Sequence, residues 1–308
     1  MFQLVSCGGC DFSKEEAQKH SVEIVPFYVT LDHETHLKEG VDISKEEYFK
    51  RLKEDSKLFP KTAQPSPQDY MDVYTPYIEA GKDIISLTIS SKLSGTYNSA
   101  TLAANTLMDE YPDRKIVVVD SLNGSVGQGL ILKELIKMRD IGFSVNKAAK
   151  IAKEVVKTTQ TYFSLDNLEY LKRGGRVGPT TALVGGILGL RPVLYLANGS
   201  VEQLDSVRGK KKVIQLMEEG VSAVLRDDID NININVGHIL SGGEADYLKA
   251  RLENSLGIKM LNEPAEVGVT IGTHAGPGAL VVSYCKKYEA IVNNQKNFYD
   301  LAVEKIGA

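Results

Sequence analysis

Residues 83–100 read DIISLTISSKLSGTYNSA, and this stretch decides the fold. Its first part, residues 84–89, is a short run rich in β-branched side chains, which predicts a strand buried on both faces. A cluster of hydroxyls follows, and Ser94 is a suitable N-cap for a helix that begins there. Gly95 lets the backbone turn or approach a ligand closely. Free amides at a helix start beside several hydroxyls favour an anion site, although a well-capped helix alone explains the same residues.

The chain before and after this stretch alternates predicted strands and helices. Serines followed three residues later by an acidic residue mark helix starts at Ser13, Ser44 and Ser66. Strands are predicted at residues 2–5, 23–31, 84–89 and 115–119, with residues 32–42 as a polar loop. This alternation predicts a parallel sheet covered on both faces, so residues 1–160 are expected to form an α/β domain.

The second half has a different pattern. Residues 191–204 predict a hairpin that turns at Asn198-Gly199. Further strands are predicted at residues 162–165, 231–239, 267–271 and 279–285, and helices at residues 166–174, 211–225 and 243–256, the first of them capped by Asp166. Hairpins mixed with helices indicate an α+β domain with a mainly antiparallel sheet over residues 161–308.

Composition limits the classes of function. The chain has 308 residues, 43% of them hydrophobic and 25% charged, which is typical of a soluble protein of about two domains. A net charge of −4 argues against a nucleic-acid partner. The longest apolar run, residues 182–190, is too short to span a membrane, and we expect no signal peptide. Three cysteines fit a reducing compartment, so a cytoplasmic location is expected.

Motifs for metals and nucleotides are weak or missing. Cys7 and Cys10 form a CxxC pair, but a zinc site needs more ligands than the remaining cysteine offers, so we interpret them as structural or incidental. His33 and His36 lie in the polar loop and are interpreted as solvated surface. The sequence contains no Walker A lysine motif and no kinase catalytic loop. We therefore expect no metal, no cofactor and no ATP site of the chain's own.

Two alternative functions stay open. Ser125 follows a predicted strand in a context similar to a nucleophile elbow, and Ser125, Asp166 and His274 occur in the order found in α/β-hydrolases. A serine hydrolase or acyltransferase is therefore one alternative. Binding of some other apolar anion is the second. His274 is expected in a loop between two strands, where its imidazole would be aimed at a cleft or would lie in solvent.

The motifs together resemble the DegV family of bacterial fatty-acid-binding proteins along nearly the whole chain. The matching segments are LSGTY at residues 93–97, DS at residues 120–121, LEYLKRGGR at residues 168–176, RPVL at residues 191–194, VR at residues 207–208 and HAGPGA at residues 274–279. Residues 62–66, TAQPS, resemble the family's TSQPS with Ala63 as a departure. The family's TDSxxD pattern after the first strand is kept only in its last position, Asp11.

The resemblance implies a function and a set of site residues. Family members bind one long-chain fatty acid between two domains and present it to a separate kinase subunit that makes acyl phosphate, as part of phospholipid metabolism. The carboxylate would bind at Thr62, Ser94, Gly95 and His274. Arg176 and Arg208 would lie near the mouth and bind phosphate or the kinase. Residues 183–190 would line the tail tunnel, and transient contact with a membrane surface is compatible with this role.

Overall fold

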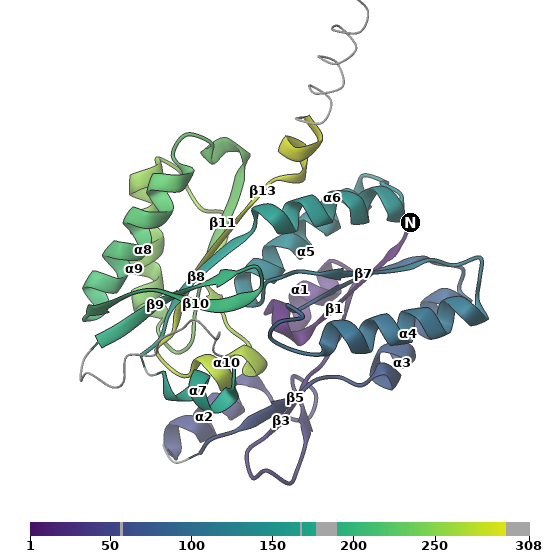
Figure 1. The fold of residues 1–308 in the computed structure, drawn as a ribbon, viewed down its shortest axis with the longest axis horizontal. Coiled ribbons are helices and arrows are strands. Elements are labelled where there is room, and N and C mark those ends of the chain that lie inside the picture. The colour runs from purple at the N-terminus through teal and green to yellow at the C-terminus, as the bar shows by residue number, and fades with distance from the viewer. Residues whose placement is uncertain (56–57, 167, 177–189, 294–308) are drawn as a thin grey trace, which may run out of the picture.

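Three sheets form the framework of the protein (Figure 1). The computed structural model describes residues 1–55, 58–166, 168–176 and 190–293. No helix within these ranges is long and apolar enough to cross a membrane. The predicted tail-lining segment, residues 183–189, lies outside the described part of the chain, and Leu190 begins a strand.

The first sheet is parallel and covered on both faces, as the sequence predicts. Its strand order is β2-β1-β6-β7, and every neighbouring pair is parallel. The strands are β1 (Gln3–Cys7), β2 (Val22–Val25), β6 (Ile84–Thr88) and β7 (Ile116–Asp120). Helices α3 (Pro67–Glu79) and α4 (Thr96–Glu110) pack on one face, and α5 (Ser125–Asp140) and α6 (Val145–Thr158) pack on the other. The predicted capping box of Ser13 and Glu16 starts the short α1 (Lys14–Lys19).

The predicted strand at residues 23–31 is two strands in different sheets. Pro26 has no N–H to donate to a ladder, and the chain leaves β2 there. Residues beyond it form β3 (Tyr28–Thr30), the centre of a small antiparallel sheet of order β4-β3-β5. Its edges are β4 (Leu37–Lys38), inside the predicted polar loop, and β5 (Lys61–Ala63); α2 (Lys45–Glu54) lies between these two in sequence.

The second large sheet is mainly antiparallel, as predicted. Its order is β10-β9-β8-β13-β11-β12, and the β11–β12 pair alone is parallel within the described sheet. The strands are β8 (Gln160–Ser164), β9 (Leu190–Ala197), β10 (Ser200–Arg208), β11 (Ile232–His238), β12 (Ala265–Glu266) and β13 (Leu280–Lys286). Asn198 and Gly199 have φ angles of 49° and 87°, so the predicted hairpin turn is confirmed.

The helices of the second half cover both faces of this sheet. Side chains of α8 (Lys210–Leu225) and α9 (Gly242–Leu256) form a core with one face. The other face packs with α7 (Glu169–Gly174), α10 (Val269–Ala275) and the first-half helix α2. Figure 1 shows α2, α7 and α10 grouped on that side.

The predicted strand at residues 267–271 is wrong, because α10 begins at Val269. The β-branched residues of this segment favour a strand, but tertiary packing decides the conformation. The helix buries Val269, Thr270, Gly272 and Thr273, and the ring of Phe49 lies directly against Gly272. His274 therefore lies in the last turn of a helix and not in a loop between strands.

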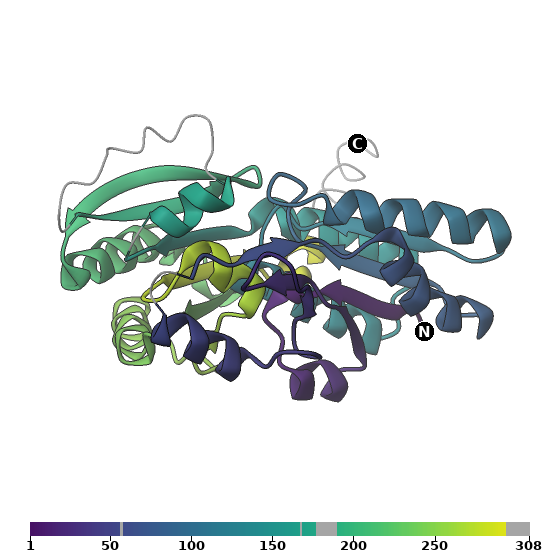
Figure 2. The same ribbon diagram turned by 90° about the horizontal axis from the view of Figure 1, so that it is seen from below.

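The two halves share a core. Helix α5 is buried on nearly every side and contacts strands of both large sheets. The Ser90 hydroxyl donates to the Gly199 carbonyl at 2.9 Å, which joins the β6–α4 loop to the β9–β10 turn. Figure 2 shows the two large sheets side by side along the long axis of the molecule. The division of the chain at residue 160 stays a prediction; the six-stranded sheet begins at Gln160.

Candidate functional site

A pocket lies where the two halves meet. Its empty volume is about 930 Å³, including the part open to solvent. Strands β8, β9, β10 and β13 of the six-stranded sheet contribute one wall, and α10 contributes another. Most lining residues are apolar: Phe27, Ile89, Leu93, Phe163, Leu171, Leu196, Val201, Ile239, Val267, Ile271, Ala275, Ala279 and Val281. An apolar cavity with a few polar groups is the usual form of a small-molecule site.

The polar groups include three of the predicted carboxylate-binding residues. Thr62, Ser94 and His274 all line the pocket, together with Arg176. They come from β5, from the β6–α4 loop and from α10, so residues far apart in sequence meet in one place. The Thr62 hydroxyl and Nε2 of His274 lie 2.7 Å apart and form a hydrogen bond.

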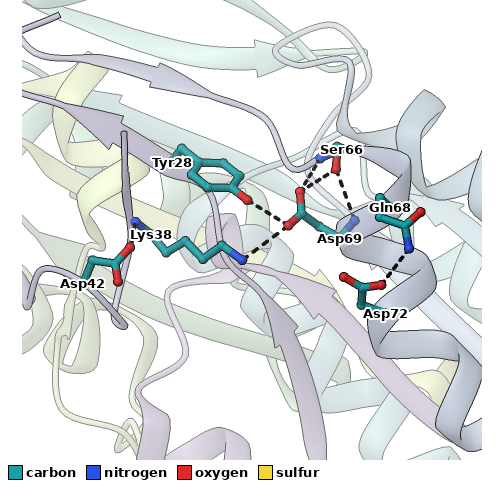
Figure 3. Close-up of polar contacts among 7 residues, drawn as sticks. All are labelled: Tyr28, Lys38, Asp42, Ser66, Gln68, Asp69 and Asp72. Carbon is teal, nitrogen blue, oxygen red and sulfur yellow. Dashed lines mark hydrogen bonds and ion pairs between the residues drawn. The ribbon is translucent and has the colours of Figure 1, made fainter. Parts of the chain in front are cut away.

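The strand that carries Thr62 is held by a polar network (Figure 3). Thr62 pairs with Val29 of β3, and the neighbouring Tyr28 donates its hydroxyl to Oδ1 of Asp69 at 2.8 Å. Nζ of Lys38 lies 3.5 Å from the same oxygen. The second oxygen of Asp69 accepts from the Ser66 amide at 2.8 Å, which completes the capping box of α3. The small sheet is thereby fixed to the start of α3, and Thr62 with it.

His274 is neutral near pH 7. Burial, and then the nearby Arg176 cation, lower the pKa of this imidazole to about 4. Nδ1 is buried and has no hydrogen-bond partner in the described part of the chain. A Cβ placed on Gly174 of α7 would lie only 2.2 Å from Nδ1, so the glycine makes room for the ring. An Nδ1 without an acceptor favours the tautomer that carries its proton on Nε2, which then donates to Thr62.

Ser94 and Gly95 are arranged differently from the prediction. The N-cap of α4 is Gly95 and not Ser94, and this cap makes no side-chain hydrogen bond. Ser94 instead shares a 2.7 Å hydrogen bond with the hydroxyl of Thr96. The side chain of Gln64 occupies the space in front of Gly95, because a Cβ there would lie 2.4 Å from Oε1 of Gln64.

Gln64 is a pocket residue that the sequence reasoning missed. It stands two positions after Thr62 in the TAQPS segment, and its Nε2 donates to the Ser99 hydroxyl at 3.1 Å. Its place beside Thr62 was the available signal. Only the packing against Gly95 shows why this position takes a long polar side chain.

The two predicted arginines occupy different places. Nε of Arg176 donates to the Leu93 carbonyl at 3.2 Å, and its guanidinium also donates to the Gly174 carbonyl. Arg176 thus ties α7 to the β6–α4 loop at the polar end of the pocket. Arg208 is exposed at the end of β10 and does not belong to the lining residues.

The hydrolase trio is not assembled. Ser125 has the positive φ of a nucleophile elbow, 54°, but its hydroxyl donates to the Asp11 carboxylate rather than to an imidazole. Asp166 does not cap α7, whose N-cap is Leu168, and it forms an ion pair with Arg191. His274 bonds Thr62. The three groups therefore lack the chain of hydrogen bonds that nucleophilic catalysis requires.

Two partly buried carboxylates at the start of α10 were not predicted. Asp11 accepts from the Gly268 amide at 2.9 Å as well as from Ser125. Glu39 accepts from the Thr270 hydroxyl. Burial raises the pKa of Asp11 to about 7 and also raises the pKa of Glu39. These contacts anchor the helix that carries His274, and the only sequence signal was Asp11, the one retained acidic position of its motif.

The cysteine pair lies in the core. Cys7 and Cys10 are free thiols, and both are buried. Burial raises the pKa of both, so neither is a ready thiolate. The Sγ of Cys7 accepts from the Ile89 amide at 3.3 Å. Among the described residues, no group of three His, Cys, Asp or Glu side chains is placed to hold a metal ion.

Known proteins match this chain over nearly its whole length. Residues 2–287 match the sequence model of a protein family described as uncharacterised, the DegV family. A DegV domain-containing protein of Clostridium perfringens is 32% identical over 277 residues, which cover 89% of this chain and 95% of the relative.

Solved structures of two relatives are also similar. A stearic-acid-binding protein from Eubacterium ventriosum has a TM-score of 0.89 and 32% identity, with coverage of 94% of this chain and 100% of the other. A fatty-acid-binding DegV family protein from Thermus thermophilus has a TM-score of 0.83 and 30% identity, with coverage of 92% and 99%.

Proposed function

The chain belongs to the DegV family, and on that basis we propose that it binds one long-chain fatty acid in the pocket between its halves. We further propose that it presents the carboxylate to a separate kinase subunit, which forms the acyl phosphate. The observation that carries the proposal is the hydrogen-bonded pair Thr62–His274, which lines a mostly apolar pocket together with Ser94. Two relatives of similar fold are named for fatty-acid binding.

The apolar wall would supply most of the affinity. Burying roughly 15 methylenes would gain about 12 kcal/mol before the costs of association. Such a contribution is not directional, because it depends on the area removed from water. The polar end would therefore decide how the acid is oriented and add less to its affinity.

The head group would be held by hydroxyl donors. Neutral His274 donates from Nε2 to Thr62, which leaves the Thr62 proton free for a carboxylate oxygen. In the same way, Thr96 can donate to Ser94 and leave the Ser94 proton for the ligand. The Arg176 cation nearby favours a negative charge at this place. Gly95 would contribute indirectly, by making room for Gln64.

The kinase would act from outside the pocket. The sequence has no phosphate-cradling motif, so the phosphoryl donor would be bound by the partner. Arg208, exposed on β10, is proposed to contact the partner or its phosphates, as is Arg176 at the polar end. A cytoplasmic location is part of the proposal, since the three cysteines are free thiols.

Mass spectrometry of ligand released from the purified protein tests the binding proposal. We expect one long-chain fatty acid per chain after expression in a bacterial host. The delipidated protein should rebind such an acid. A different apolar anion in the released fraction, with no rebinding of tetradecanoic to octadecanoic acids, would overturn the proposal.

A further inference from the structure

A second cavity lies directly behind one wall of the pocket. This groove, with an empty volume of about 810 Å³, opens between α2 and the end of β11. Ile239 and Val267 line both the pocket and the groove. Both side chains are nearly fully buried, with 2% and 1% of their surface exposed. A wall one side chain thick therefore separates the pocket from the groove.

The backbone fixes this wall in place. The Val267 amide donates to the His238 carbonyl at 3.0 Å, and the Ile239 amide donates to the Ala279 carbonyl at 3.0 Å. Both residues belong to one apolar core with Phe49, which contributes to the far side of the wall. The hydrogen bonds hold the backbone of both wall residues, and the core packing surrounds their side chains.

The wall lies away from the polar end of the pocket. Val267 precedes α10, and His274 lies in the last turn of that helix. Within the helix, a rise of 1.5 Å per residue separates Val269 from His274 by about 7.5 Å along the axis, and Val267 precedes Val269 by two residues. Across the sheet, the pocket extends from Val201 on β10 to Ile239 after β11. Four strand spacings correspond to roughly 19 Å, so Ile239 lies at one edge of the pocket.

Resting on the proposed function, we propose that Ile239 and Val267 are specificity-determining residues that close the tail end of the pocket and set the upper limit of fatty-acid length. An acid that is too long must push its terminal methyl group into this wall. The buried wall does not yield readily, because protein interiors are close-packed. Affinity therefore falls once the chain outgrows the pocket.

The groove behind the wall differs from the pocket in its charges. Lys45, Lys50 and Lys53 line it, together with Glu46 and Glu266, and Lys45 is paired with Glu266 at 2.8 Å. An acyl chain that passed through the wall would meet Phe49 first and then reach these cations. The second carboxylate of a dicarboxylic acid, at the far end of its acyl chain, would be buried against the wall in the wild type. It would reach lysines once the wall was removed.

The test uses the double variant Ile239→Ala, Val267→Ala in the full-length chain. Wild type and variant are delipidated and titrated with octadecanoic acid, docosanoic acid and the α,ω-dicarboxylic acid eicosanedioic acid. Leu196→Ala is the matched control, because Leu196 lines the pocket but not the groove. Val236→Ala, buried in β11 within a different core, controls for lost stability.

The wild type should bind octadecanoic acid much more tightly than the other two acids. The double variant should bind docosanoic acid and the dicarboxylic acid at least about tenfold more tightly than the wild type does, since each methylene buried is worth about fourfold in Kd. Adding Lys50→Glu to the double variant should weaken the binding of the dicarboxylic acid and leave the binding of the other two acids unchanged. Leu196→Ala should lengthen the longest acid that binds by no more carbons than the few that the substitution removes from the side chain.

Two negative outcomes are distinguishable. Equal binding of octadecanoic acid by wild type and double variant, with no gain for either longer ligand, would overturn the role of the wall and leave fatty-acid binding intact. A wild type that binds none of the acids would instead contradict the proposed function. Should the double variant fail to fold, Val267→Ala alone is titrated in the same way, and an unchanged length preference would overturn the proposal.

Discussion

At the scale of single residues, the central contact is the hydrogen bond between Thr62 and His274. Burial together with Arg176 keeps the pKa of His274 well below neutrality, so a neutral imidazole makes this contact. Thr62 then acts as the donor toward the pocket. His274 thus orients the Thr62 hydroxyl toward the proposed ligand.

Thr62→Val removes that hydroxyl and keeps the shape of the side chain. The loss of a hydrogen bond to a charged carboxylate should cost roughly 1.5–3 kcal/mol at the head group. Tail burial remains, so fatty-acid affinity should fall less than the rate of acyl phosphate formation with a cognate kinase. Both are measured on the same delipidated protein. Thr106→Val on the outer side of α4 should change neither, and equal loss of binding and transfer in Thr62→Val would contradict the assigned role.

At the scale of elements, two contacts of α10 decide where His274 lies. Its C-terminal turn packs against α7 through Gly174, and its N-terminal end is anchored by Asp11 and Glu39. Each contact can be tested without changing a residue that touches the proposed ligand.

Gly174→Ala should displace the imidazole. The added Cβ would lie 2.2 Å from Nδ1, a distance that neither α7 nor α10 accommodates without a shift. We expect the Thr62–His274 bond to break and acyl phosphate formation to fall by about tenfold or more, which corresponds to one lost hydrogen bond. Gly220→Ala in α8, where no atom lies within 4 Å of the added Cβ, should leave the reaction unchanged. Wild-type transfer rates in Gly174→Ala would show that the ring position is not decisive.

Asp11→Asn should change how stability depends on pH. The pKa of Asp11 is raised to about 7 by burial, so between about pH 4 and 7 the folded protein holds more protons at this site than the unfolded chain. Its contribution is therefore fully present at low pH and is lost as pH rises through 7. The lowered pKa of His274 acts in the opposite direction but is common to both proteins.

The measurement is urea unfolding of wild type and Asp11→Asn at pH 5 and pH 8. The stability of the variant relative to wild type should increase by about 1–3 kcal/mol between these two values. Asp109→Asn, exposed on α4, is the control and should follow the wild type at both values. A constant difference between wild type and Asp11→Asn would mean that Asp11 does not titrate in this range.

Local patterns predicted some elements correctly and misassigned others. The N-cap at Ser66 and the turn at Asn198-Gly199 depend on nearby residues, and both are confirmed. Residues 267–271 carry strand-forming side chains, yet α10 forms there because its packing against Phe49 outweighs local preference. Asp11 and Gln64 were missed as structural supports for the same reason, since their partners lie far away in the sequence.

At the scale of the whole molecule, the site exists because two differently built halves close over one pocket. Motifs could place Thr62, Ser94 and His274 in one site before any geometry was known, since their order and spacing resemble a family. The Ile239–Val267 wall could not be predicted in that way. It depends on a second cavity that only the packed structure reveals.

The isolated chain should bind the acid but not activate it. With MgATP and fatty acid and no other protein, we expect no acyl phosphate above the uncatalysed background, because no motif for holding a triphosphate is present in the sequence. Hydroxylamine trapping followed by mass spectrometry detects the product. Acyl phosphate formed by this chain alone would place the catalytic site in this chain. That result would contradict the proposal that a separate kinase subunit carries out the phosphorylation.

Nuclear magnetic resonance of octadecanoic acid labelled with carbon-13 at its carboxyl group tests the central claim most directly. The delipidated protein should give one bound carboxyl resonance at one acid per chain. Ser94→Ala and Thr62→Val should shift that resonance, whereas Val201→Ala in the apolar wall should leave it in place. A bound acid whose carboxyl resonance is the same in all four proteins, or the absence of any bound resonance, would contradict the account.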